Sequence, residues 1–284
     1  MVWTSARRWL AALIAAAVLA GCGGPVPQPS IPVAATSGAE SQLIAELYVA
    51  ALRYYGNPAH VQASDDPLQQ LDSGAATVAP GFTGQLLARF DPSATVRSDA
   101  QVYRKLLSAL PEGIAAGDYT ISADDKPAIA VTEQTVAGWP ERDATTFARR
   151  CAGMTVGAVT SAQNPQRVGT CTVSDGPRFA AASTLFDALE SGQVQGAWTT
   201  SAAPDVPSDV VVLSDKQALI RAENVVPLYR RNELTESQVL ALNEIAGVLD
   251  TGSLADMRRQ VAEGTDPGVV AGRWLDAHPL GVGH

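Results

Sequence analysis

The chain has 284 residues, of which 46% are hydrophobic and 17% are charged, and its formal net charge is −9. This composition excludes a disordered chain, and the length allows one large domain or two small ones with a sizeable core. The acidic, lysine-poor composition also argues against nucleic acid as a partner, because binding to phosphates needs clustered Lys and Arg.

The amino terminus has the pattern of a bacterial lipoprotein signal. Two arginines precede the apolar run 9–19, which is too short to span a bilayer, and Leu19-Ala20-Gly21-Cys22 follows it. This lipobox-like sequence predicts that residues 1–21 are a signal peptide and that Cys22 carries a lipid, which would hold the protein on the extracytoplasmic face of the cell membrane. The alternative is a plain secretory signal with a chance cysteine. Residues 22–32 are rich in Pro and Gly and are expected to be a flexible tether.

The first part of the chain alternates strand and helix patterns. The expected elements are a strand over Val33–Thr36, a helix from Ser41 to Gly56, a strand over His60–Ala63, a short helix over Asp65–Leu71, a strand over Ala76–Ala79 that stops at Pro80-Gly81, a helix with Leu86, Leu87 and Phe90, and a helix over Asp99–Leu110. Phe82-Thr83-Gly84 therefore follows a strand and begins a helix, which is where ligands bind in open α/β sheets. An ordinary turn with Phe82 in the core is the alternative.

The middle of the chain repeats this pattern. The expected elements are a strand over Ala128–Val131, a helix starting at Thr132–Val136, a helix over Thr145–Arg150, a strand over Met154–Val159, a polar loop over Thr160–Thr170, a helix over Phe179–Leu189 and a strand over Val194–Trp198. Leu189-Glu190-Ser191-Gly192 precedes its strand as Leu71-Asp72-Ser73-Gly74 precedes the earlier one. Two similar units suggest two lobes with a ligand cleft between them.

The two remaining cysteines, Cys151 and Cys171, lie in this middle part. In an oxidising compartment such a pair is most simply a disulfide, which would stabilise the fold by roughly 3 kcal/mol by closing a loop of about 20 residues. No histidine lies near either cysteine in the sequence, so we expect no metal site there, and no cofactor is indicated.

The last part has two strand patterns and then a helical tail. The strands are expected over Val210–Leu213 and Val225–Tyr229, and the tail has a capping box at Thr235 and Gln238, a similar pattern at Ser253 and Asp256 before a helix over Leu254–Val261, and Asp266-Pro267 before a last helix through Val270 and Trp274. Such a tail is expected to pack on the first lobe.

Several of these segments together resemble the substrate-binding proteins of ABC importers with a type II fold. Within that group they are similar to the family that binds glycine betaine, choline and carnitine, the quaternary-amine osmoprotectants. The resemblance is carried by SQLIAELY at 41–48, LDSG at 71–74 with GFTG at 81–84, LESGQV at 189–194, VVVL at 210–213 with ENVVP at 223–227, LNEIAG at 242–247 and the closing segment 271–275.

The resemblance implies an α/β, two-lobed, periplasmic-binding-protein-like fold of type II with the ligand cleft between the lobes. Residues 33–118 would begin lobe 1, residues 119–206 would form lobe 2, and residues 207–284 would return to lobe 1. It also implies a monomer without catalytic activity that captures a small molecule by lobe closure and passes it to ABC permease and ATPase subunits.

The family holds the methylated ammonium of its ligand in a box of tyrosines, because π faces attract a desolvated cation. Matching positions give these expected ligand-binding residues: Ser37, Phe82, Thr83, Arg167, Trp198, Thr199, Glu223 and Asn224. Arg167 would hold an anionic group of the ligand, or else be a solvated loop charge. Trp198 would offer a cation-π face, or else pack in the core. Glu223 would meet a ligand cation or pair with Arg221.

Two positions depart from the family pattern, because Phe82 and Pro127 stand where tyrosines are expected. The ligand would then be an osmoprotectant-like amine or a diverged molecule, and the alternative function is a non-transporting envelope lipoprotein, a sensor or interaction protein. An enzyme is not expected, because the chain has 3 histidines, two of them in the tail. Pairs such as Asp65-Asp66 and Asp124-Asp125 are expected to cap helices or to be solvated.

Overall fold

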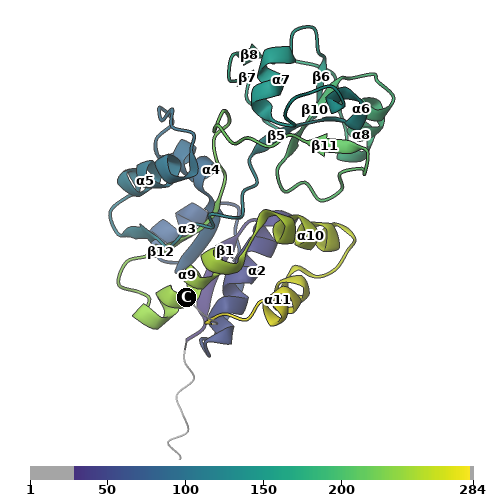
Figure 1. The fold of residues 1–284 in the computed structure, drawn as a ribbon. Coiled ribbons are helices and arrows are strands. Elements are labelled where there is room, and N and C mark those ends of the chain that lie inside the picture. The colour runs from purple at the N-terminus through teal and green to yellow at the C-terminus, as the bar shows by residue number, and fades with distance from the viewer. Residues whose placement is uncertain (1–28, 282–284) are drawn as a thin grey trace, which may run out of the picture.

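The computed structural model describes residues 29–281, which form two lobes joined by two chain segments (Figure 1). The predicted signal peptide, Cys22 and the first part of the predicted tether lie outside these described residues. Within the described part of the chain, none of the helices combines the length and the apolar character needed to cross a membrane.

Lobe 1 is a five-stranded sheet with helices on both faces. Its strands lie in the order β2-β1-β3-β12-β4, where β1 runs parallel to β2 and β3, and β12 runs antiparallel to β3 and β4. The elements are β1 (Ile31–Ala35), α2 (Ala39–Tyr54), β2 (Ala59–Ala63), α3 (Pro67–Ser73), β3 (Val78–Phe82), α4 (Thr83–Phe90), α5 (Asp99–Ala109), β4 (Ile114–Ala116), β12 (Val225–Arg230), α9 (Glu236–Val248), α10 (Thr251–Ala262) and α11 (Pro267–Ala277).

Lobe 2 has a second five-stranded sheet, in the order β11-β5-β10-β6-β9, and a small hairpin of β7 and β8. The elements are β5 (Pro127–Thr132), α6 (Glu133–Val136), α7 (Ala144–Arg150), β6 (Val156–Val159), β7 (Arg167–Val168), β8 (Cys171–Thr172), β9 (Arg178–Phe179), α8 (Ala182–Glu190), β10 (Gly196–Thr200) and β11 (Val210–Val212). A disulfide joins Cys151, just after α7, to Cys171 in β8, which confirms the predicted pair.

Successive side chains of the strands point to opposite faces of the sheet, and this alternation divides the core of lobe 1 into two layers. Val33 and Ala35 of β1 pack with α2 and the C-terminal helices, whereas Ala34 between them packs on the other face with α3, α4 and α5. This is the period of two that a strand buried on both faces requires.

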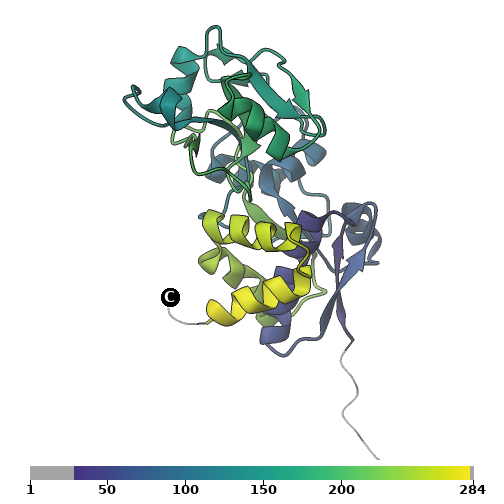
Figure 2. The same cartoon turned by 90° about the vertical axis from the view of Figure 1, so that its right-hand side faces the viewer.

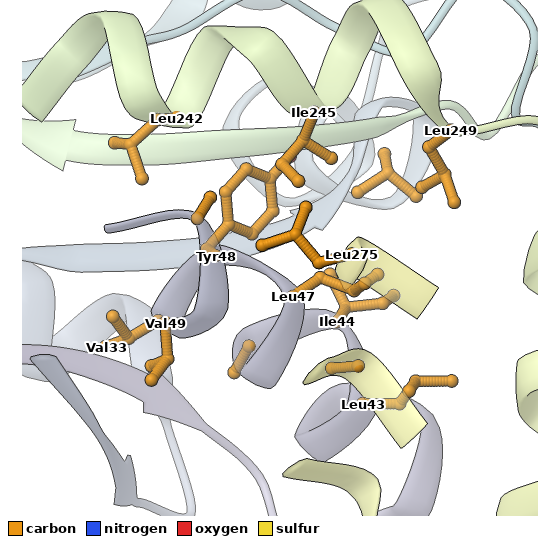
Figure 3. Packing of buried hydrophobic residues seen from close by; sticks show 14 of the residues in the cluster. Val33, Leu43, Ile44, Leu47, Tyr48, Val49, Leu242, Ile245, Leu249 and Leu275 are labelled. Carbon is orange, nitrogen blue, oxygen red and sulfur yellow. The ribbon is translucent and has the colours of Figure 1, made fainter. Parts of the chain in front are cut away.

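Helix α2 is the centre of the first layer, and Figure 3 shows Leu47 and Tyr48 packed among Leu242, Ile245 and Leu275. Figure 2 shows the yellow-green tail helices gathered beside α2, and α9, α10 and α11 all contact this helix.

The two connecting segments, residues 117–126 and 213–224, lie side by side between the lobes. Asp124 and Asn224 form an antiparallel bridge, and the Asp125 N–H donates to the Glu223 carbonyl at 2.9 Å. The chain passes from β4 to β5 through the first segment and from β11 to β12 through the second. Since β11 pairs with β5, the return to lobe 1 comes after β11, later than the expected boundary at residue 207.

Several element boundaries differ from the sequence prediction, most of them by one or two residues. Strand β3 continues through Pro80-Gly81 to Phe82, because Pro80 lies opposite Pro227 of β12, where neither residue has an N–H to donate. Helix α8 begins at Ala182, since Phe179 pairs with Val159 as part of β9. Helix α10 begins at Thr251.

The helix caps were predicted in part. Helix α10 is capped by Asp250, whose carboxylate accepts from the Ser253 N–H at 2.7 Å, so the predicted cap at Ser253 is wrong. The capping box at Thr235 and Gln238 is present, and Asp266 caps α11, as predicted.

Candidate functional site

A central cavity of about 770 Å³ lies between the lobes. Lobe 1 supplies Glu40 at the start of α2, Gln85 of α4 and Arg258 of α10, and the connecting segments supply Asp125 and Glu223. The lining residues of lobe 2, with Pro127 at the start of β5, are Val159, Ser161, Ala162, Gln163, Asn164, Ala182, Leu185, Phe186, Trp198, Thr199, Thr200, Ala203, Pro204 and Asp205.

Two further cavities adjoin the central one. The arginine cavity, of about 610 Å³, is lined by Arg97, Arg167 and Arg221 and shares Glu223 and Asn164 with the central cavity. The lobe-1 cavity, of about 440 Å³, shares Glu40 and Gln85 with the central cavity and is otherwise lined by residues of lobe 1. The three cavities therefore form one extended cleft.

Five of the predicted ligand-binding residues line this cleft. Trp198, Thr199 and Glu223 line the central cavity, Arg167 lines the arginine cavity, and Phe82 lines the lobe-1 cavity. The fold thus brings to one cleft residues that lie up to 141 positions apart in the sequence, from Phe82 to Glu223. Their contact with a ligand stays a prediction.

The other three predicted residues lie elsewhere. Thr83 and Asn224 are buried between β3 and β12, where the Thr83 hydroxyl accepts from the Asn224 N–H at 3.1 Å. The Asn224 amide also donates to the carbonyls of Thr120 and Ala123, so it ties the two connecting segments together. Ser37 is exposed in the loop after β1. None of the three cavities that form the cleft, as the described residues define it, is lined by these side chains.

Glu223 is held by the amino terminus of α4. The Gln85 N–H donates to its Oε2 at 2.9 Å, and its own N–H donates to Asp124 Oδ1 at 2.9 Å. A Cβ on Gly84 would lie 2.5 Å from the Glu223 carboxylate, so the close approach needs glycine. Burial raises the pKa of Glu223 to about 7, although hydrogen bonds from the Gln85 and Gly84 N–H groups lower it. The carboxyl group is therefore both fixed in place and able to change protonation near neutral pH.

A second charged group spans the lobes at Arg258. Its guanidinium pairs with Asp125 at 2.7 Å and with Glu40 at 3.3 Å, and donates to the Ala202 carbonyl of lobe 2 at 3.0 Å. Burial raises the pKa of Glu40 to about 7, Arg258 opposes this, and Asp125 adds to it. Asp125 is buried and ion-paired, so the prediction of a capping or solvated role was wrong for this residue, whereas Asp66 does cap α3.

Trp198 packs in the core and also lines the central cavity, and its role as a cation-π face stays a prediction. In the core of lobe 2 it packs with Ile129, its partner across the paired strands β10 and β5. Its remaining surface lines the central cavity. Phe186 of α8 adds a second aromatic side chain to this wall. Aromatic faces beside carboxylates favour a cationic group, because both attract positive charge.

Several residues of the cleft carried no sequence signal of their own. Glu40, Gln85, Arg97 and Arg258 lie in ordinary helix or loop patterns, and only the fold brings them to the cleft from separate parts of the chain. Phe186 is one of the apolar residues of a predicted helix, which core packing alone would explain. Among residues 29–281, no cluster of three or more His, Cys, Asp or Glu side chains is arranged to hold a metal ion.

Comparison with known proteins gives a family match over most of the chain. The family model described as the substrate-binding domain of an ABC-type glycine betaine transport system matches residues 29–277. No curated protein sequence matches.

Solved structures match the fold. The chain is similar to a glycine betaine/carnitine/choline ABC transporter protein, with a TM-score of 0.74, 15% identity, and coverage of 88% of this chain and 98% of that one. It is also similar to apo YehZ from Escherichia coli, with a TM-score of 0.71, 16% identity and coverage of 88% and 99%. A choline-binding protein of an ABC transporter, solved with choline, matches with a TM-score of 0.53, 13% identity and coverage of 88% and 89%. The fold is thus that of the type II binding proteins, as the sequence predicted.

Proposed function

Since the chain belongs to the family of substrate-binding domains of ABC-type glycine betaine transport systems, we propose that it captures a positively charged or zwitterionic small molecule in the cleft and delivers it to an ABC importer. The lipobox further supports a lipid anchor at Cys22 on the extracytoplasmic face of the cell membrane. In this arrangement the permease and ATPase subunits are the partners, and the chain itself performs no chemistry.

One observation carries the proposal: the central cavity combines aromatic walls with an excess of acid. Its lining contains four carboxylate residues and one guanidinium, beside Trp198 and Phe186. Its volume of about 770 Å³ is in the range of small-molecule sites. A cation over an aromatic face gains roughly 0.5–2 kcal/mol, and the carboxylates add to this attraction.

Lobe closure is supported by the distribution of the lining residues. Glu40 and Gln85 belong to lobe 1, Trp198 and Phe186 to lobe 2, and Glu223 to a connecting segment. A ligand that touches both walls stabilises the arrangement in which the walls are close, and the paired connecting segments can act as the hinge.

The residues that line the cleft favour a ligand other than a simple betaine. Phe82 has no hydroxyl, and Pro127 lines the central cavity where the family has a tyrosine. The box of tyrosines is therefore replaced in part by carboxylates, which can accept hydrogen bonds from an ammonium group that still has N–H donors. Amines with N–H groups accordingly belong in any ligand screen beside glycine betaine, choline and carnitine.

The same departures favour a second candidate, a non-transporting envelope lipoprotein on this scaffold. Such a protein would bind no amine in the cleft.

Calorimetric titration of the exported protein with Cys22→Ser against this panel separates the two candidates. We expect at least one amine to bind, and Trp198→Phe to weaken it about three- to tenfold, because the smaller ring is the poorer cation-π partner. Trp139→Phe is the matched control, since Trp139 packs against the same core outside the cleft. Equal losses in both variants, or no binding by any amine, would overturn the proposal.

A further inference from the structure

The arginine cavity has a charge opposite to that of the central cavity. Arg97 comes from the loop before α5 in lobe 1, Arg167 from β7 in lobe 2, and Arg221 from a connecting segment. Throughout residues 29–281, no ion pair involves any of these three side chains. Glu223, at the border with the central cavity, is the single acidic residue in the lining. Three guanidinium groups at one cavity without carboxylate partners form a positive site.

Among the described residues, two of these arginines have most of their donors without a partner. Arg97 and Arg167 are exposed, and the one hydrogen bond that Arg167 makes within residues 29–281, from Nη1 to the Thr172 hydroxyl, is long at 3.5 Å. Arg221, in contrast, donates to the carbonyls of Ala94 and Val96, so it holds the loop that carries Arg97 and contributes charge rather than free donors.

The positions of both free arginines are fixed by the surrounding backbone. The Arg97 carbonyl accepts from the Ala222 N–H at 2.9 Å, which ties its loop to the connecting segment. Arg167 lies in the hairpin whose Cys171 is bonded to Cys151. The two guanidinium groups thus approach one cavity from opposite lobes. Each is carried by a backbone segment that is bonded to a neighbouring part of the chain.

The cavity has more positive charge and more hydrogen-bond donors than a carboxylate ligand needs. A carboxylate has a single charge and two oxygens, which one arginine can bind in a bidentate manner. A phosphoryl group has up to two charges and three free oxygens, so it can accept from two guanidinium groups on different sides. The polar lining residues Thr95, Gln163, Asn164 and Gln166 offer further hydrogen bonds.

We propose that the arginine cavity is a subsite for a phosphoryl group, a proposal that rests on the proposed function. The ligand is then an extended amine with a phosphate ester at its other end. Its cation lies in the central cavity beside Trp198, and its phosphate lies between Arg97 and Arg167. The shared residues Asn164 and Glu223 mark the border that such a ligand crosses.

The test compares phosphocholine, choline and inorganic phosphate by calorimetric titration of the exported protein with Cys22→Ser. Phosphocholine is expected to bind at least tenfold more tightly than choline, and inorganic phosphate is expected to compete with phosphocholine. Arg97→Gln and Arg167→Gln are each expected to lose about tenfold or more in phosphocholine affinity while choline affinity stays unchanged. Arg273→Gln, an exposed arginine of α11 outside the cleft, is the control for net charge.

Phosphocholine affinity no greater than that of choline overturns the subsite, as do equal losses for both ligands in the arginine variants. The two arginines lie in different lobes, so misfolding of one variant leaves the other to decide. If no amine binds, the proposed amine site fails, and the titration with inorganic phosphate alone then decides the phosphoryl subsite. Phosphate binding that is abolished in both arginine variants supports the subsite. Absence of phosphate binding refutes it.

Discussion

The close approach of α4 to Glu223 gives a sharp prediction for Gly84→Ala. In an ordinary helix this change stabilises by about 0.5–1 kcal/mol, because glycine loses more backbone entropy on folding than alanine. At Gly84 the new Cβ would lie 2.5 Å from Glu223 Oε1 and 2.6 Å from the Ala222 carbonyl oxygen. The Glu223 side chain could rotate away, but the carbonyl belongs to the backbone of the connecting segment. That segment must therefore move.

The clash outweighs the gain in helix propensity. Overpacking costs about 1–3 kcal/mol, and we expect about 2–2.5 kcal/mol here because a backbone atom must move; after the helix gain of about 0.5–1 kcal/mol the net loss in the free energy of unfolding is about 1–2 kcal/mol. For a protein of this size that loss corresponds to a fall in Tm of about 2–8 °C. Displacement of the Glu223 carboxylate should also weaken binding of a cationic ligand in the central cavity.

Gly272→Ala is the matched control, because Gly272 lies within α11 and nothing stands within 4 Å of a Cβ built there. We expect Gly272→Ala to raise Tm by about 1–4 °C in a calorimetric scan, on the same scale of 0.5–1 kcal/mol. The two variants have the same chemical change in the same kind of element and should shift Tm in opposite directions. A Gly84→Ala protein as stable as the Gly272→Ala protein would refute the reasoning.

Three further predictions concern other parts of the structure. Burial raises the pKa of Glu223 from 4.5 to about 7, so the contribution of this protonation to the free energy of unfolding is complete below about pH 4.5 and is lost as the pH rises through 7. Glu223→Gln should flatten this part of a plot of the free energy of unfolding against pH. Replacing Cys151 and Cys171 together by Ala should lower the stability of lobe 2 by about 3 kcal/mol, an effect that a reductant should reproduce in the wild type and not in the variant. Asp250→Ala should cost about 1 kcal/mol in urea unfolding and Ser253→Ala much less, and the reverse order would contradict the assigned cap.

Local sequence signals predicted the elements well. Gly74 and Gly192 both have positive φ and end their helices as the repeated Leu-x-Ser-Gly pattern indicated. The capping box at Thr235 depends on residues three apart, so a short window contains all the information. Such features are decided by neighbours in the chain.

Long-range pairing explains what the sequence did not show. Pro80-Gly81 has the form of a strand end, and it remains in β3 because Val226 and Pro227 supply the partner strand from far along the chain. Asp125 has the appearance of a surface charge until α10 brings Arg258 to it. The acidic and basic residues of the cleft come from both lobes and from the connecting segments, so no single segment predicts the two charged cavities.

The central place of β12 in the sheet of lobe 1 has a consequence for how the protein is made. All strands of lobe 2 lie in one continuous run, 127–212, whereas lobe 1 needs β12 between β3 and β4 to complete its sheet. As the chain emerges from its amino terminus, lobe 2 therefore has every partner it needs before lobe 1 does. Until residues 225–230 emerge, β3 has an open edge, which is the kind of surface that pairs with other chains. Correct folding of lobe 1 thus depends on prompt completion of the last sixty or so residues, or on a chaperone that covers β3 until they arrive.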